Sequence, residues 1–188
     1  LLRLHPELVR MDEAVGATFL THQPEEGKDG YFLLLVSPNP RSAEKKVVPK
    51  DVVVILDHSG SMSGEKLDQA KAAVGFVLKN LNAEDHFNVV AYSDSVEAFF
   101  EELVPANRDK IDLALQRLDA VDATGGTNIH EALQVGLRDI AERKGDARPA
   151  YVIFLTDGLP TIGKTDENEI LKDSAAANKG KARLFAFG

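Results

Sequence analysis

The chain has 188 residues, of which 44% are hydrophobic and 28% are charged, and its formal net charge at pH 7 is −8. This length and composition predict a globular domain with a well-buried core and exclude a fibrous or disordered protein. The negative charge and the lack of a basic stripe argue against nucleic acid as a partner.

Cysteine is absent, so the chain has neither disulfides nor a thiolate metal site. Its apolar runs are far shorter than the roughly 20 residues that span a bilayer, and it does not open with a signal peptide. We therefore expect no membrane insertion. The abrupt start at Leu1 and the strand-like residues 184–188 at the other end predict a piece of a longer protein.

Residues 1–49 predict a β-rich N-terminal extension that ends in a linker. Five prolines and a turn-like segment at residues 25–30 separate its short apolar pieces. Residues 31–36 have the composition of a strand, and residues 15–20 are placed to pair with them across the turn.

From residue 50 onward, apolar strand patterns alternate with helical patterns. Strands are predicted over residues 52–56, 87–92, 96–100, 151–155 and 182–187, and helices over residues 65–81, 111–118, 129–140 and 166–178. In the first helix, apolar residues recur at three- and four-residue steps and form one stripe that faces the sheet. The alternation predicts an α/β fold with a doubly wound, mostly parallel sheet flanked by helices.

The apolar run at residues 52–56 leads directly into Asp57, Ser59 and Ser61, which alternate with His58 and Gly60. Such a run suits a strand buried on both faces, and ligands usually bind at the loop that follows such a strand. Residues two apart in an extended turn project the same way, so the carboxylate and the two hydroxyls can converge. Hard oxygen donors of this kind favour Mg²⁺, Mn²⁺ or Ca²⁺.

Two further loops can complete such a site, because Mg²⁺ prefers an octahedron of oxygens. One loop is T-G-G-T-N at residues 124–128, where the glycines allow a tight path that turns Thr127 inward. The other is T-D-G at residues 156–158, which follows a second apolar strand and places Asp157 at the same edge of the sheet as Asp57. The predicted metal ligands are therefore Asp57, Ser59, Ser61, Thr127 and Asp157.

These five residues, in D-H-S-G-S, G-G-T-N and T-D-G, resemble the metal-ion-dependent adhesion site of von Willebrand factor A-type domains. The resemblance covers residues 50–188, and it implies that the last strand and helix of that domain are absent. Residues 31–38 and the run S-G-S-M-S-G-E-K are similar to inter-alpha-trypsin inhibitor heavy chains and their bacterial relatives.

The resemblance implies a binding module rather than an enzyme. In such domains the divalent cation keeps an open position that a Glu or Asp carboxylate of a protein partner fills, and a glycan or matrix component is the alternative partner. The resemblance also implies an extracytoplasmic location, whether secreted, periplasmic or on the cell surface.

Other interpretations of the same residues are weaker. Ser59 and Asn128 could simply cap helices, and Asp57 and Asp157 could be turn residues. A metal-dependent nucleotide or phosphoester hydrolase is the main functional alternative, but Glu65 separates Gly64 from Lys66 where a phosphate-binding loop needs the lysine directly after the glycine. The side chains of His58, Asp94 and Asp122 are expected to be outside the ligand set.

Overall fold

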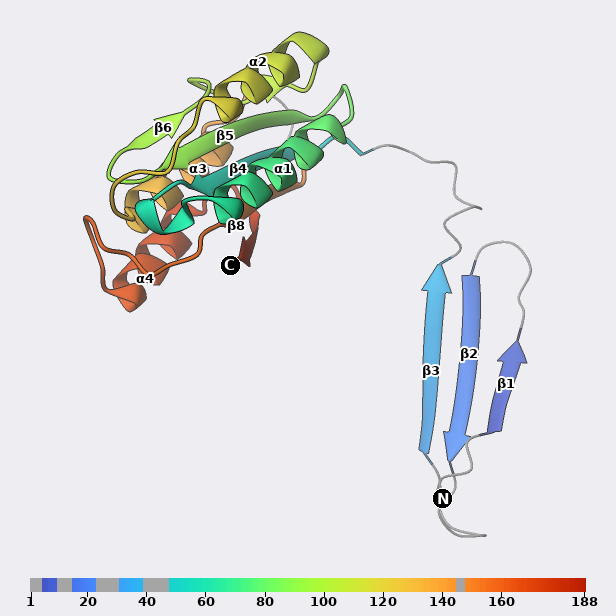
Figure 1. Cartoon of the computed structure of the whole chain (residues 1–188). Coiled ribbons are helices and arrows are strands. Elements are labelled where there is room, and N and C mark those ends of the chain that lie inside the picture. Colours follow the sequence, from blue (N-terminus) through green and yellow to red (C-terminus); the bar gives the residue numbers. More distant parts are fainter. Residues whose placement is uncertain (1–4, 10–14, 23–30, 39–47, 145–147) are drawn as a thin grey trace. The chain divides into compact units, whose positions relative to one another are not determined.

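The computed structural model contains two compact units, residues Leu1–Val47 and Val48–Gly188 (Figure 1). The structure describes residues 5–9, 15–22, 31–38, 48–144 and 148–188. The predicted turn at residues 25–30 and most of the linker lie outside the described residues.

The first unit contains an antiparallel sheet of three strands, β1 (His5–Val9), β2 (Val15–His22) and β3 (Tyr31–Pro38). The pairing of β2 with β3 is the one that the sequence predicts, with Ala17 opposite Val36. The sequence did not predict β1, which pairs with β2 and begins with His5 and Pro6.

The second unit is built on a six-stranded sheet in the order β6-β5-β4-β8-β9, with the short β7 paired to β5. Strands β4, β5, β8 and β9 run parallel, whereas β6 and β7 run antiparallel to β5. The predicted α/β class and mostly parallel sheet are therefore confirmed. The strands are β4 (Asp51–Asp57), β5 (His86–Tyr92), β6 (Val96–Ala98), β7 (Val104–Pro105), β8 (Ala150–Leu155) and β9 (Arg183–Phe187).

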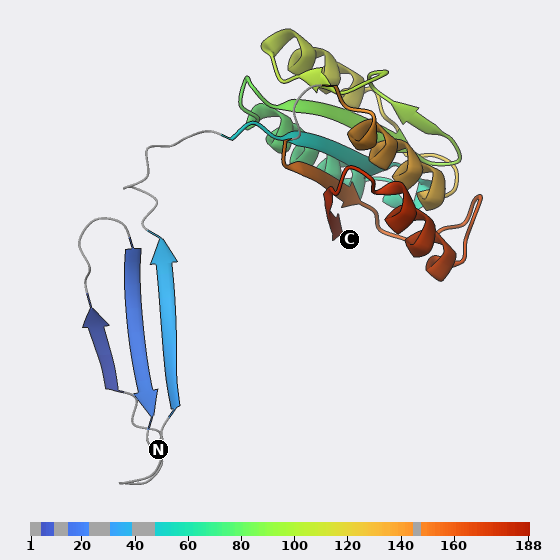
Figure 2. The same ribbon diagram turned by 180° about the vertical axis from the view of Figure 1, so that it is seen from behind.

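Four α-helices and one short 3₁₀ turn connect these strands in the described chain. They are η1 (Gly60–Met62), α1 (Glu65–Lys79), α2 (Arg108–Asp119), α3 (Ile129–Ala141) and α4 (Glu167–Ala177). Helices α1 and α2 pack on one face of the sheet, and α3 and α4 pack on the other (Figures 1 and 2). The four helices lie where the sequence predicts them, within a few residues at each end.

Strand β4 lies at the centre of the sheet, and all seven of its residues are buried. Its side chains alternate between the two faces, as strand geometry requires. Val53 and Ile55 contribute to the core beneath α3, whereas Val52, Val54 and Leu56 contribute to the core beneath α1 and α2. This burial explains why the strand reads as a continuous apolar run rather than as an alternating pattern.

The side chains of Asn107, Asn128 and Asp166 cap α2, α3 and α4 by accepting a hydrogen bond from a backbone N–H three residues further on. Asn128 thus acts as the helix cap that one sequence interpretation suggested. Among the described helices, none is long and apolar enough to cross a membrane.

The parallel register of β4 and β8 positions the candidate site. Leu56 lies opposite Leu155, so Asp57 and Thr156 leave the sheet side by side at its carboxyl edge. Tyr92, the last residue of β5, lies opposite Asp57 on the other side. Three strand ends therefore meet where ligands usually bind in open α/β sheets.

Candidate metal centre

Asp57 is fully buried at the end of β4, and both of its carboxylate oxygens accept hydrogen bonds. Oδ1 accepts from the backbone N–H of Ser59 at 2.8 Å. Oδ2 accepts from the Thr156 hydroxyl at 2.7 Å and from the Tyr92 phenol at 3.3 Å. These donors fix the orientation of the carboxylate, and Oδ1, which accepts one of the three bonds, keeps lone-pair capacity for a cation.

Tyr92 acts as a donor to Asp57. Its ring is buried and stacks on Phe154, with 5.8 Å between ring centroids. Burial raises the pKa of Tyr92 well above its usual value, and the negative charge of Asp57 acts in the same direction. The phenol therefore keeps its proton and presents it to Asp57.

The two serine hydroxyls lie next to each other. The Oγ atoms of Ser59 and Ser61 are 3.1 Å apart, and Ser61 donates to Asp157 Oδ1 at 2.7 Å. Ser59 precedes η1, but its side chain makes no capping hydrogen bond. The Ser59 side chain therefore does not act as a helix cap.

Asp157 completes this row of oxygens from the loop after β8. Its second oxygen, Oδ2, accepts a hydrogen bond from Lys66 Nζ at 2.6 Å. The bond from Lys66 lowers the pKa of Asp157, and the bond from Ser61 lowers it further, although partial burial opposes both. Lys66 lies 91 residues away in the sequence, and no local sequence pattern indicates this ion pair.

The T-G-G-T-N loop is hydrogen-bonded to the loop that carries the serines. Gly60 N donates to Gly125 O at 3.0 Å, and Thr124 N donates to His58 O at 2.8 Å. Gly125 has φ +70°, and a Cβ there would lie 2.5 Å from the Asp94 carboxylate, so only glycine suits this position.

Thr127 is held from the opposite side by the loop after Asp157. Its backbone N–H donates to Thr161 Oγ1 at 2.9 Å, and its carbonyl accepts from the backbone N–H groups of Thr161 at 3.0 Å and Ile162 at 3.3 Å. Sequence reasoning missed Thr161, because its role depends on how two distant loops meet. The loop that carries Thr127 thus contacts both other loops of the site.

The Thr127 hydroxyl is different from the other four side chains. Thr127 is only 4% exposed, and no described group exchanges a hydrogen bond with its Oγ1. The structure therefore brings Asp57, Ser59, Ser61 and Asp157 into one chain of contacts. Thr127 is outside this chain of contacts, and its loop is joined to the serine loop by the bond from Gly60 N to Gly125 O. With no described partner, this hydroxyl keeps its lone pairs for a ligand.

The donor set fits a hard divalent cation. Neighbouring oxygens in an Mg²⁺ octahedron with bonds of 2.0–2.1 Å lie about 3 Å apart, which is close to the observed 3.1 and 2.7 Å contacts. The described residues contain no cluster of three or more His, Cys, Asp or Glu side chains that could hold a metal. A cation at this edge would therefore depend on the hydroxyls as much as on the two carboxylates.

The three side chains expected to be outside the ligand set have other contacts or are exposed. His58 Nδ1 lies 2.8 Å from the backbone carbonyl of Asp122, whose own side chain is exposed. Asp94 Oδ1 accepts a hydrogen bond from Gly126 N and so closes the glycine loop. The contribution of Asp94 to loop shape was not evident from the sequence.

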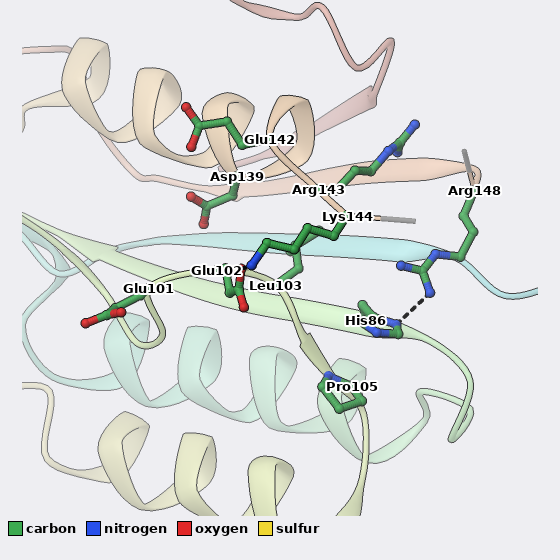
Figure 3. Close-up of a pocket in the computed structure, with 10 residues that line it drawn as sticks. All are labelled: His86, Glu101, Glu102, Leu103, Pro105, Asp139, Glu142, Arg143, Lys144 and Arg148. Carbon is green, nitrogen blue, oxygen red and sulfur yellow. Dashed lines mark hydrogen bonds and ion pairs between the residues drawn. The ribbon is translucent and has the colours of Figure 1, made fainter. Parts of the chain in front are cut away.

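A charged hollow of about 400 Å³ lies at the amino edge of the sheet, opposite the edge that carries the candidate metal centre (Figure 3). Asp139 points toward it from α3, and Lys144 reaches across it to Glu102 at 2.5 Å. Arg148 pairs with Asp51 at 3.0 Å and donates to His86 Nδ1 at 2.7 Å. Arg143 also pairs with Asp51, so the described cations that line the hollow are already paired and do not form a free anion site.

The fold and the three-loop arrangement together define a von Willebrand A-type architecture. A family model described as von Willebrand factor type A domain matches residues 51–188. The chain therefore belongs to the von Willebrand factor type A domain family, as its motifs predict.

The chain is also similar to inter-alpha-trypsin inhibitor heavy chain H4. It is 32% identical to the Homo sapiens protein over 166 residues and 35% identical to the Sus scrofa protein over 167 residues. Each match covers 86% of this chain and 17% of the relative, so the chain spans less than a fifth of the length of these relatives.

Solved structures share the fold at low sequence identity. A von Willebrand factor type A protein from Catenulispora acidiphila matches with a TM-score of 0.64 and 18% identity, over 98% of this chain and 39% of that one. The pilus adhesin SpaC from Lactobacillus rhamnosus GG matches with a TM-score of 0.54 and 19% identity, over 85% of this chain and 19% of that one.

Proposed function

We propose that this domain is a divalent-cation-dependent protein-binding module whose metal ligands are Asp57, Ser59, Ser61, Thr127 and Asp157. The cation would be Mg²⁺, with Mn²⁺ or Ca²⁺ as alternatives. The observation that carries this proposal is the continuous row of oxygens from Ser59 through Ser61 to Asp157, with contacts of 3.1 and 2.7 Å across two loops.

The balance of charge at the site favours capture of an acidic partner. Three of the five proposed ligands are neutral hydroxyls, and Lys66 neutralises part of the charge of Asp157. Three donors surround the carboxylate of Asp57. When bound, the cation would supply a Lewis-acidic position for a Glu or Asp carboxylate of the partner.

The metal proposal is tested by thermal unfolding with increasing MgCl₂ at constant ionic strength. At a hundredfold excess over the dissociation constant, the free energy of unfolding should rise by about 2.7 kcal/mol. The variant Ser61→Ala should lose most of this response, because it removes one proposed ligand from an exposed residue. The matched control Ser63→Ala, an exposed serine two residues away, should respond like the parent.

The proposed ligands would be wrong if Ser61→Ala and Ser63→Ala responded equally to MgCl₂. The partner chemistry is tested separately with a panel of synthetic peptides that carry a single Glu and matched peptides in which Gln replaces it. Binding should require both the Glu and Mg²⁺, and EDTA should abolish it. Equal binding of the Gln peptides would contradict capture of a carboxylate.

The enzymatic alternative makes an opposite prediction. A metal-dependent hydrolase should turn over ATP or a generic phosphoester in the presence of Mg²⁺, and Ser61→Ala should reduce that turnover. We propose no such activity, because Glu65 interrupts the phosphate-loop pattern and Ser59 stands where an aspartyl-phosphate mechanism needs a second acid.

We also propose that residues 50–188 form the binding module, that residues 1–49 form a separate extension, and that the protein acts outside the cytoplasm. The two compact units and the extent of the family match support the division, and the similarity to inter-alpha-trypsin inhibitor heavy chains supports the location. Fractionation of cells that express the full-length protein tests the location, and recovery of the protein in the cytoplasm would contradict it.

A further inference from the structure

Lys66 already occupies one oxygen of a proposed metal ligand. Its ammonium lies 2.6 Å from Asp157 Oδ2, while the other oxygen of that carboxylate faces Ser61 at 2.7 Å. The Asp157 side chain is 14% exposed and the Lys66 side chain is 61% exposed. A solvent-accessible cation thus sits on the same carboxylate that the divalent ion would use.

The position of Lys66 in α1 is not explained by helix stability. Lys66 is the second residue of the helix, and the first turn of a helix favours negative rather than positive side chains. The other charged residues of that turn, Glu65 and Asp68, follow this preference. The pair with Asp157 is the only ion pair of Lys66 among the described residues, and it joins α1 to the loop after β8.

We propose that Lys66 is a tethered monovalent cation that shares Asp157 with the divalent ion and thereby weakens the affinity of the site for that ion. This inference rests on the proposed function. It adds a regulatory residue outside the five ligands, and it predicts that removing the charge of Lys66 makes metal binding tighter.

Two opposing effects determine the direction of the change. Lys66 holds Asp157 in position before the ion binds, which favours metal binding. An ion pair this exposed changes the metal-binding constant by at most about fivefold. The positive charge of Lys66 also repels the ion, which opposes metal binding. A single positive charge about 4 Å from a divalent ion lowers the metal-binding constant by about thirtyfold even in bulk water. Screening by salt reduces both effects. Repulsion is the larger effect, so removing the charge of Lys66 should raise the affinity for the divalent ion by about tenfold.

The test is isothermal titration calorimetry of the chain with MgCl₂ and with MnCl₂ at fixed ionic strength. Lys66→Met keeps the length of the side chain and removes its charge, and it should bind both ions about tenfold more tightly than the parent. Lys66→Arg keeps the charge and should stay within about twofold of the parent. Lys71→Met is the matched control, because Lys71 lies on the same helix and its ammonium donates, among the described groups, to the backbone carbonyl of Asp119 alone.

Each outcome has one meaning. If Lys66→Met binds the ions no more tightly than the parent, or if Lys71→Met tightens binding equally, Lys66 has no special role and the inference is wrong. If the parent binds neither ion, the proposed function fails, and the inference fails with it. A melting curve in EDTA shows whether Lys66→Met is folded, and Lys66→Gln replaces it if it is not.

Discussion

Asp57 and Asp139 are both buried aspartates of the second unit, but their surroundings differ. Three donors face the carboxylate of Asp57, from Ser59, Thr156 and Tyr92. Asp139 is 9% exposed and receives one hydrogen bond from the described groups, from Asn88 Nδ2 at 2.8 Å. Hydrogen-bond donors stabilise the charged form of a buried carboxylate, as at Asp57. Where donors are few, as at Asp139, burial favours the protonated form.

Burial raises the pKa of Asp139 from 3.8 to about 6, although Asn88 and Arg138 oppose the shift. A carboxyl with a raised pKa binds its proton more tightly in the folded state than in the unfolded state. Its contribution to stability is therefore fully present below about pH 4 and is lost as the pH rises through about 6.

The variant Asp139→Asn should remove this dependence on pH. Its amide oxygen can still accept the bond from Asn88, and it carries no charge at any pH. At pH 7.5 the free energy of unfolding should rise by up to about 3 kcal/mol relative to the parent, with little difference near pH 4. Urea unfolding at several pH values measures this. An equal effect at both pH values would show that the charge of Asp139 is not the cause.

At the scale of elements, the three loops of the site behave as one interlocked group. The loop at 124–128 bonds to the serine loop on one side and to Thr161 on the other. Gly126 lies at the second contact, where a Cβ would be 2.6 Å from Ile162 Cγ1 and 2.8 Å from Thr161 Oγ1. A side chain there would force the two loops apart.

Gly126→Ala should therefore destabilise the folded domain by about 1–3 kcal/mol and weaken the Mg²⁺-dependent shift in melting temperature. Gly158→Ala is the matched control, because the nearest atom to a Cβ at that loop glycine is Ser61 Oγ at 3.9 Å. Thermal unfolding with and without MgCl₂ compares the two variants. Similar losses in both would mean that the contact with Thr161 and Ile162 has no particular importance.

Elements with strong periodic patterns could be predicted from the sequence, and short ones could not. The strands β4 and β8 and the four helices follow from their apolar runs and stripes. Strand β7 has two residues and η1 has three, which is too short for any periodicity. Strand β6 ends at Ala98 rather than residue 100, because Asn88 binds the backbone of Phe100 with its side chain.

The candidate site could also be predicted only in part from the sequence. Its proposed ligands stand in short motifs at the ends of strands, where side-chain chemistry and spacing can be read directly. The groups that hold those ligands are scattered: Lys66 is 91 residues from Asp157, and Thr161 is 34 residues from Thr127. Such contacts depend on the paths of loops in space, which no local pattern encodes.

At the scale of the whole molecule, the chain divides between Val47 and Val48, and the family match begins at residue 51. The five proposed ligands and the groups that bond to them, including Lys66, Tyr92, Thr156 and Thr161, all lie in the second unit. Metal binding should therefore be a property of that unit alone.

A chain shortened to residues 48–188 should keep the Mg²⁺-dependent rise in melting temperature of the parent, because every proposed ligand and every bond that orients one is retained. Differential scanning calorimetry with MgCl₂ and with EDTA measures the rise in both chains. The shortened chain with Ser61→Ala serves as the control and should lose most of the rise. If the shortened chain folds in EDTA but no longer responds to Mg²⁺, the first 47 residues contribute to the site, and the five proposed ligands do not form it by themselves.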